Sequence, residues 1–252
     1  MLRRILIVTS LLLLPLPVPL KAETPDIPDL LARMDEVLRG KSHDMTVTLS
    51  VQTPQWQREY RLRVFMKGVD FSFARVLSPS KVEGQGFLRL QSRLWQYLPS
   101  AERTILIPPS LMLDDFMGSD FSNDDFVKLT YMPRDYTGTL AGEETVDGFE
   151  TWHLTLMPNP DAPVTYGKLE VWLRRADAAP VKLEFYDDKL VHIRTLHYRE
   201  FKTFGNREIP SVWQMVNHRE EGHETTVTIL EAAYDLELDN NLFTRQSLEK
   251  YP

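Results

Sequence analysis

The chain contains no cysteine, and this absence excludes several classes of protein at once. Without thiols it can form no disulfide bond, no thiolate metal site and no cysteine nucleophile. Familiar catalytic motifs are missing too: no Gly-x-Ser-x-Gly sequence occurs, and Gly84-x-Gly86 lacks the third glycine of a dinucleotide-binding loop. We therefore predict a binding protein that is not an enzyme and that needs no cofactor.

Basic residues are outnumbered, with 29 Lys and Arg against 36 Asp and Glu and a formal net charge of −7. Proteins that bind nucleic acids gather Lys and Arg on one face to neutralise phosphates, and no basic cluster occurs in this chain. The composition therefore argues against a nucleic-acid partner.

Metal-binding motifs are weak as well. A calcium loop read from Asp120 would place Asp125 where glycine is needed and Tyr131 where the bidentate glutamate belongs. The six histidines form no zinc motif, although a cross-strand pair of His218 and His223 is an alternative to exposed turn histidines. We predict no metal site and interpret most acids near Asp120 as residues that favour a helix start.

Long hydrophobic runs are confined to the N-terminus. Arg3 and Arg4 precede an apolar run from residue 5 to residue 14, and a proline-rich stretch follows up to Ala22. This run is shorter than the ~20 residues that span a bilayer, and the pattern is typical of a secretory signal peptide. We predict a signal peptide at residues 1–22 and a soluble protein exported to the bacterial periplasm, with a retained membrane anchor as the alternative.

One amphipathic helix is expected directly after this segment. Its apolar residues recur at helical spacing, Asp26 can cap its start, Pro28 lies in the first turn, and Gly40 ends it. The apolar stripe consists of Ile27, Leu30, Leu31, Met34, Val37 and Leu38. We expect this stripe to pack on the face of a sheet.

From residue 44 onward the apolar period changes from 3.6 to 2, which indicates half-buried strands. Short connections predict eleven to thirteen antiparallel strands, and a sheet of that size curls. One long helix cannot cover its concave face alone. We predict a mainly β (α+β) fold: an unclosed antiparallel β-barrel of about eleven strands, with an N-terminal helix and a helical lid over an apolar cavity, in a single domain at residues 23–252.

The stretch from residue 94 to residue 129 is the candidate binding segment. It begins as a hairpin, Pro108 and Pro109 end the strand pairing, and Ser122 with Asp125 forms a helix-capping pattern. Large apolar side chains fill it, and each would gain about 1.5 to 3 kcal/mol on burial. They either plug the protein's own core or close a cavity over an apolar guest. The predicted ligand-binding residues are Trp95, Tyr97, Leu111, Met112, Leu113, Phe116, Met117, Phe121 and Phe126.

Three arginines alternate with apolar residues in predicted strands, namely Arg61, Arg63 and Arg89. The alternation favours an outer, solvated face for their side chains. The alternative is that some of them point inward toward a lipid headgroup.

The segment from Trp95 to Phe126 reads WQYLPSAERTILIPPSLMLDDFMGSDFSNDDF. Its F-M-G-S-D-F-S-x-x-D signature, Phe116 to Asp125, resembles the outer-membrane lipoprotein-sorting protein family, the relatives of the periplasmic lipoprotein carrier LolA. This resemblance extends over most of the chain after the predicted signal peptide. It implies an unclosed barrel with an apolar cavity and a helical lid.

The resemblance also implies a function. The expected role is carriage of lipoprotein acyl chains or lipids by a monomer, between an inner-membrane transporter and an outer-membrane acceptor. The alternative is a structural or regulatory periplasmic partner of an inner-membrane transporter, whose apolar loop docks on a protein.

Overall fold

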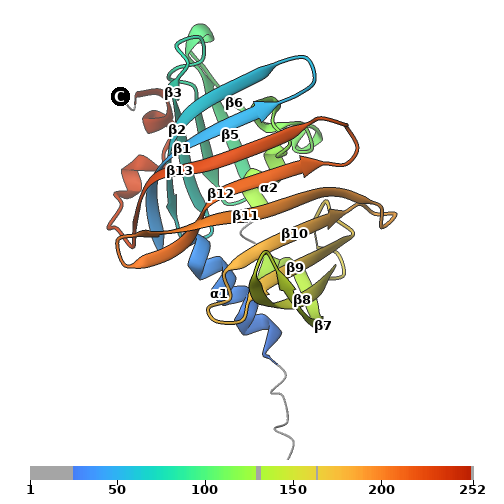
Figure 1. Ribbon diagram of the computed structural model, residues 1–252. Coiled ribbons are helices and arrows are strands. Elements are labelled where there is room, and N and C mark those ends of the chain that lie inside the picture. Colours follow the sequence, from blue (N-terminus) through green and yellow to red (C-terminus); the bar gives the residue numbers. More distant parts are fainter. Residues whose placement is uncertain (1–24, 129–131, 163, 251–252) are drawn as a thin grey trace, which may run out of the picture.

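The structure, a computed structural model, describes residues 25–128, 132–162 and 164–250. Within these ranges thirteen strands form one antiparallel sheet in the order β6-β5-β4-β3-β2-β1-β13-β12-β11-β10-β9-β8-β7 (Figure 1). The prediction of a mainly β fold with one large, unclosed antiparallel sheet is confirmed, with two strands more than the eleven expected. The predicted signal peptide lies outside the described residues, as does Leu129.

The strands follow the alternating segments of the sequence. They are β1 (Ser42–Gln52), β2 (Gln57–Lys67), β3 (Phe71–Ser78), β4 (Gly86–Leu90), β5 (Arg93–Leu98), β6 (Arg103–Leu106), β7 (Tyr136–Val146), β8 (Phe149–Pro158), β9 (Lys168–Arg174), β10 (Pro180–Tyr186), β11 (His192–Phe204), β12 (Arg207–Asn217) and β13 (Glu224–Tyr234). The first strand pairs with the last, so β1 and β13 lie side by side in the middle of the sheet.

Alternation along β1 and β2 sorts side chains between the two faces of the sheet. Met45 pairs with Val64 and Val47 pairs with Leu62, so apolar side chains meet on the concave face. Cross-strand apolar pairs of this kind stabilise a sheet because they bury area on both strands together. The register of the hairpin is therefore fixed by burial, since a slip of one residue would turn these side chains to the other face.

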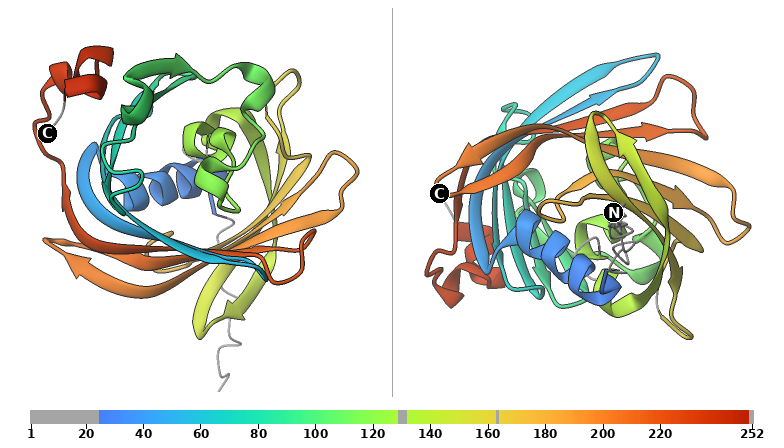
Figure 2. Two further views of the ribbon diagram at one scale, coloured as in Figure 1. Left: turned by 90° about the horizontal axis from the view of Figure 1, so that it is seen from above. Right: turned by 60° about the horizontal axis from the view of Figure 1, so that its bottom comes forward.

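Helix α1 (Ile27–Arg39) lies on the concave side of the sheet, where Figure 2 shows the strands curving around it. Asp26 caps it as predicted, because its carboxylate accepts a hydrogen bond from the Asp29 amide at 3.2 Å. Leu30, Leu31 and Met34 are buried. Two short helices lie on the same side, namely α2 (Asn123–Lys128) and α3 (Met132–Asp135).

The convex face is covered at one end by the C-terminal segment. Phe243 and Leu248, the latter in α4 (Arg245–Lys250), form a buried cluster with Phe65, Phe73 and Leu88 from β2, β3 and β4. Figure 2 shows α4 outside the curve of the sheet. Apolar side chains on both faces of β2–β5 are thereby removed from water. This explains why neither face of these strands is consistently polar.

The close approach of α1 to β7 depends on a glycine. A Cβ at Gly138 would lie 2.6 Å from Ile27 Cγ2 and 2.8 Å from Leu156 Cδ2. Any side chain there would push the helix from the sheet, so Gly138 fixes how deeply the start of α1 sits on the concave face.

Gly138→Ala should therefore lower the free energy of unfolding by about 1 to 3 kcal/mol through overpacking against α1. Gly142→Ala in the same strand is the matched control, because a Cβ at Gly142 would meet no atom within 4 Å. Chemical denaturation of both variants measures the difference. Equal stability of the two variants would show that the helix does not dock as closely as described.

Candidate functional site

An apolar cavity of about 210 Å³ lies between α1, the concave face of the sheet and the segment of residues 107–128. Both halves of the sheet contribute to its wall. The lining residues are Met34, Asp35, Leu38, Arg39, His43, Met45, Val47, Leu49, Leu62, Val64, Met66, Ser72, Phe116, Phe121, Asp125, Phe126, Met132, Leu183, Tyr198, Trp213, Val227 and Ile229. Most are aliphatic or aromatic, as in sites that bind apolar molecules.

Three of the nine residues predicted to bind ligand line this cavity: Phe116, Phe121 and Phe126. Met112 and Met117 are partly buried against the same cluster of core residues. The structure thus brings five of the predicted residues together at the cavity or directly behind its wall.

The remaining four lie elsewhere. Leu111 and Leu113 are 43 % and 58 % exposed on the outside of the 107–128 segment. Trp95 and Tyr97 pack on the convex side against the cluster that contains Phe243. The reason is the alternation of β5: Leu94 is fully buried in the concave-side cluster, so the residues on either side of it in the strand face outward.

The phenylalanines of the 107–128 segment form an aromatic stack on the cavity wall. The rings of Phe116 and Phe126 are nearly parallel with centroids 4.9 Å apart, and Phe87 of β4 lies 4.6 Å from Phe116. A tight turn directs Phe116 inward, with Met117 at φ 57° and Gly118 at φ 75°. Glycine adopts this left-handed conformation without the strain that a side chain adds.

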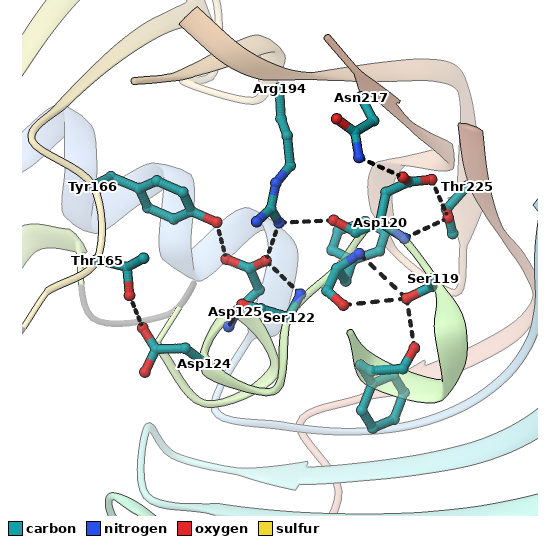
Figure 3. A network of polar contacts seen from close by, with 12 residues as sticks. Ser119, Asp120, Ser122, Asp124, Asp125, Thr165, Tyr166, Arg194, Asn217 and Thr225 are labelled. Carbon is teal, nitrogen blue, oxygen red and sulfur yellow. Dashed lines mark hydrogen bonds and ion pairs between the residues drawn. The ribbon is translucent and has the colours of Figure 1, made fainter. Parts of the chain in front are cut away.

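Polar side chains of the signature anchor this segment to the sheet (Figure 3). The carboxylate of Asp120 accepts hydrogen bonds from Thr225 Oγ1 at 2.7 Å and from Asn217 Nδ2 at 3.1 Å. The Asp120 amide donates to Thr225 Oγ1 at 2.8 Å. Ser119 Oγ donates to the Phe116 carbonyl at 2.7 Å and so fixes the turn. These bonds join the segment to β12 and β13.

Asp125 forms a second anchor. It caps α2 with Ser122 as predicted, since the Ser122 amide donates to Asp125 Oδ2 at 2.8 Å and the Asp125 amide donates to Ser122 Oγ at 3.0 Å. Arg194 Nη1 of β11 binds Asp125 Oδ2 at 2.9 Å and the Asp120 carbonyl at 2.7 Å. Tyr166 donates its hydroxyl to Asp125 Oδ1 at 2.6 Å (Figure 3).

The surroundings of Tyr166 and Arg194 fix the protonation state of each side chain. Burial, together with the negative charge of Asp125, raises the pKa of Tyr166 well above its ordinary value, so the phenol remains a hydrogen-bond donor. Burial alone would lower the pKa of Arg194, but the nearby Tyr166 and Asp125 raise it overall. The guanidinium therefore stays charged and neutralises the buried carboxylate.

Sequence reasoning missed the partners of these acids. Arg194, Asn217 and Thr225 lie about 70 to 105 residues from their partners along the chain, and they reach the segment only because β11, β12 and β13 lie side by side. The interpretation of the acids as helix-start residues is correct for Asp125, whereas Asp120 instead binds the sheet. Among the residues that the structure describes, no three His, Asp or Glu are placed to hold a metal ion.

The strand arginines differ in their surroundings. Arg61 is exposed, and Arg63 pairs with Asp44 at 2.8 Å while remaining 42 % exposed, which agrees with the outer face expected for both. Arg89 is fully buried, and its cross-strand partners are Ser72 and Leu94. The prediction of an outer face is therefore wrong for Arg89: its neighbour Leu88 joins the convex-side cluster, so Arg89 faces the concave side together with its partner Leu94.

His43 is a polar residue in the cavity wall. It is 5 % exposed, and its Nδ1 atom lies 3.1 Å from the Arg39 carbonyl. Burial lowers the pKa of His43 to about 4. The imidazole is consequently neutral at physiological pH, and it adds hydrogen-bonding capacity to the wall without adding charge.

Known proteins of similar sequence or structure identify the fold. A family model whose description reads "Uncharacterized protein" matches residues 68–250. A solved structure of a DUF1329 family protein from Desulfovibrio piger is 24 % identical with a TM-score of 0.81, covering 88 % of this chain and 97 % of that one. None of the curated proteins matches the chain.

Two further solved structures are similar. A protein from Vibrio parahaemolyticus, named for outer membrane lipoprotein sorting, is 23 % identical with a TM-score of 0.76. A LolA superfamily protein from Nitrosomonas europaea is 23 % identical with a TM-score of 0.73. In both cases the match covers 87 % of this chain and 97 % of the other. Because the family model covers more than half of the chain, the chain belongs to that family, and it shares the fold of these LolA-like structures.

The attachment of the 107–128 segment to β11 can be tested by removing its cation, Arg194. Arg194→Met leaves the Asp125 side chain, which is 2 % exposed, without its ion-pair partner. Breaking a buried pair in this way costs about 3 to 5 kcal/mol. Hydrogen exchange should accelerate most at the amides of residues 116–126, because these lose their attachment to β11.

The matched control is Arg199→Met, since Arg199 lies on the same strand but is exposed. It should change stability by no more than about 0.5 kcal/mol. Unchanged exchange at residues 116–126 in the Arg194 variant would contradict the anchoring role.

His43 should make stability depend on pH. In the unfolded chain a histidine binds a proton below its ordinary pKa of 6.5, whereas folded His43 does so only near 4. The unfolded state therefore holds more protons between these values, and stability should fall as the pH drops from 6.5 to 4. The loss amounts to about 3 kcal/mol at most.

Denaturation at several pH values measures this slope. His43→Gln should reduce it, and the remainder should come from groups such as His197 and His218, whose pKa values burial also lowers. An identical slope in wild type and variant would show that His43 is accessible to protons in the folded protein.

Proposed function

We propose that the protein is a periplasmic carrier that shields a lipoprotein acyl chain or another lipid in its cavity, without covalent chemistry. The single observation that supports this most strongly is the apolar cavity of about 210 Å³ on the concave face of the sheet. An engineered apolar cavity of roughly 150 Å³ in another protein stays dry and binds benzene or xenon. A larger cavity with an equally apolar wall suits a hydrocarbon chain.

The 107–128 segment, with α2, acts in this proposal as the lid. It contributes Phe116, Phe121 and Phe126 to the cavity wall, and hydrogen bonds and an ion pair hold it to the sheet in addition to its apolar contacts. Hydrogen bonds and one ion pair can be exchanged for bonds to water when the segment opens, so opening need not expose the whole core. Of the other six predicted residues, Met112 and Met117 would support the wall and Leu111 and Leu113 would lie on the outside of the lid, whereas Trp95 and Tyr97 pack on the convex side.

Export and organisation complete the proposal. Residues 1–22 serve as a cleaved signal peptide and residues 23–252 form one LolA-like domain that acts as a monomer. The apolar run after Arg3 and Arg4 and the absence of cysteine support this assignment. Among the described residues, no helix is both long enough and apolar enough to cross a membrane. An inner-membrane transporter would supply the cargo and an outer-membrane acceptor would receive it.

The charged groups in the cavity wall support binding rather than catalysis. Asp35 and Arg39 form an ion pair with each other, and Asp125 is held by Arg194 and Tyr166. Each of these charged groups thus has its partner within the protein. A role as an enzyme is therefore not part of the proposal.

A second candidate function rests on the outer surface of the same region. Ile105 and Leu106 on the edge strand β6, together with Leu111 and Leu113, are 40 % to 58 % exposed. Neighbouring exposed apolar side chains mark surfaces that dock on a protein or a membrane. In this alternative the protein is a structural or regulatory partner of an inner-membrane transporter, and the apolar loop binds that partner.

Filling the cavity distinguishes the two functions. Val64→Phe adds a ring to the cavity wall and should weaken binding of a fluorescent fatty acid by roughly tenfold or more, because the guest loses apolar contacts. Thermal stability should stay the same or rise as the cavity is filled. Fluorescence titration and thermal unfolding measure both effects.

The control is Val216→Phe, whose cross-strand partner Thr195 forms hydrogen bonds with His192 and His218 away from the cavity. Its fatty-acid affinity should match that of wild type. If Val64→Phe bound the fatty acid as tightly as wild type, the cavity would not be the binding site and the docking function would gain support.

A further inference from the structure

The row of residues at one end of the cavity has a different character from the rest of the wall. His43 is the first residue of β1 that lines the cavity, and Met66 lies opposite it on β2. Met66 in turn lies opposite Ser72 on β3. Further along β1 the lining residues are aliphatic. On the sheet side the polar lining residues are therefore gathered at one end, where His43 and Ser72 lie in the same row, while Asp125 lines the cavity from α2.

The hydrogen bond of His43 determines which ring nitrogen carries the proton. A backbone carbonyl only accepts hydrogen bonds, so Nδ1, which lies 3.1 Å from the Arg39 carbonyl, must be the protonated nitrogen. In a neutral imidazole the other nitrogen, Nε2, then carries a lone pair and accepts. The low pKa of this buried ring, about 4, keeps it in that neutral form.

Nothing among the described residues donates a hydrogen bond to His43 Nε2. This atom also does not belong to the buried polar atoms that are sealed without a partner. It therefore keeps accessible surface, and because His43 lines the cavity we infer that this surface faces the cavity. A buried acceptor without a donor costs free energy that a suitable guest would recover.

The two charged side chains of α1 in this wall pair with each other, while the buried Arg89 lies beyond Ser72 in the same row. Arg39 and Asp35 form an ion pair through both guanidinium nitrogens Nε and Nη2, and both side chains are largely buried. Arg39 already donates to Asp35 and to the Gly40 carbonyl, so a buried anionic headgroup would lose hydration without gaining an unpaired cation from Arg39, and the lone pair of Nε2 would repel it. An uncharged headgroup with a hydrogen-bond donor meets neither penalty.

We propose that the cavity selects neutral lipids that carry a hydroxyl or amide N–H donor at the polar end of the chain, and that His43 Nε2 accepts this hydrogen bond. The inference rests on the proposed carrier function and specifies its class of cargo. The apolar rows around Val47 and Leu49 hold the hydrocarbon, and the row of His43 and Ser72 holds the head.

The test compares three probes of equal chain length on the full-length exported protein at neutral pH: 1-decanol, decyl methyl ether and decanoate. Each competes with the neutral fluorophore N-phenyl-1-naphthylamine for the cavity. Decanol should displace the fluorophore at a concentration roughly three- to tenfold lower than the ether, as expected for one hydrogen bond, and decanoate should be weaker than decanol. The ether keeps the hydrocarbon and the oxygen but lacks the donor.

His43→Phe normalises this comparison for differences in hydrophobicity among the probes. In this variant the preference for decanol over the ether should disappear, and His43→Gln, whose amide oxygen accepts, should retain part of it. The same ratio in wild type and His43→Phe would overturn the inference while leaving the carrier function intact. Failure of every probe, and of decane, to displace the fluorophore would overturn the carrier function as well.

A measurement on wild type alone covers the case in which the variants do not fold. Nitrogen-15 NMR of the His43 ring distinguishes the protonated Nδ1 from the unprotonated Nε2. Added decanol should shift the Nε2 resonance in the direction of an accepted hydrogen bond, and the ether should not. A protonated Nε2, or equal shifts with both probes, would contradict the assignment.

Discussion

The ion pair between Arg194 and Asp125 is the interaction on which the rest of the site depends. It joins the middle of the 107–128 segment to β11, and the carboxylate simultaneously caps α2 and binds Tyr166. Removing one partner of such a buried pair leaves an uncompensated charge, so the segment has a strong preference for this one position. When the segment is in this position, its phenylalanines face the sheet instead of water.

The sheet explains why such an attachment is needed. Thirteen twisted strands curve around a concave face that is longer than one helix can cover, and α1 occupies only part of it. On the convex side, Phe243 and Leu248 of the C-terminal segment pack tightly into a cluster. On the concave side, the polar bonds of Asp120 and Asp125 hold the 107–128 segment over the sheet, and a cavity lies beneath it. The same chain thus closes one face with apolar packing and the other with an anchored segment.

Much of this architecture could be predicted from local patterns. The period of 2 along β1 and β2, the capped amphipathic helix and the Ser122–Asp125 capping pattern all depend on residues close in sequence, and the structure contains each of them. The facing of β5 could not be predicted in this way. Leu94, Trp95, Tyr97 and Leu98 offer apolar side chains to both faces, so alternation alone does not decide which face meets the cavity.

The site required long-range information that a single sequence does not contain. Arg194 and Thr225 show no local feature that marks them as partners of the signature, and His43 resembles any histidine at the start of a strand until its position in the cavity wall is known. Arg89 shows the converse error, since its alternation with apolar residues indicates a solvated face that the fold in fact buries.

The central claim is that the concave cavity remains open to a guest rather than being filled by the protein's own side chains. Native mass spectrometry of protein purified from the periplasm, followed by lipid extraction, tests it most directly. We expect a bound lipid at one molecule per chain that is released on unfolding. Protein that carries no lipid and binds no fluorescent fatty acid when one is offered would contradict it.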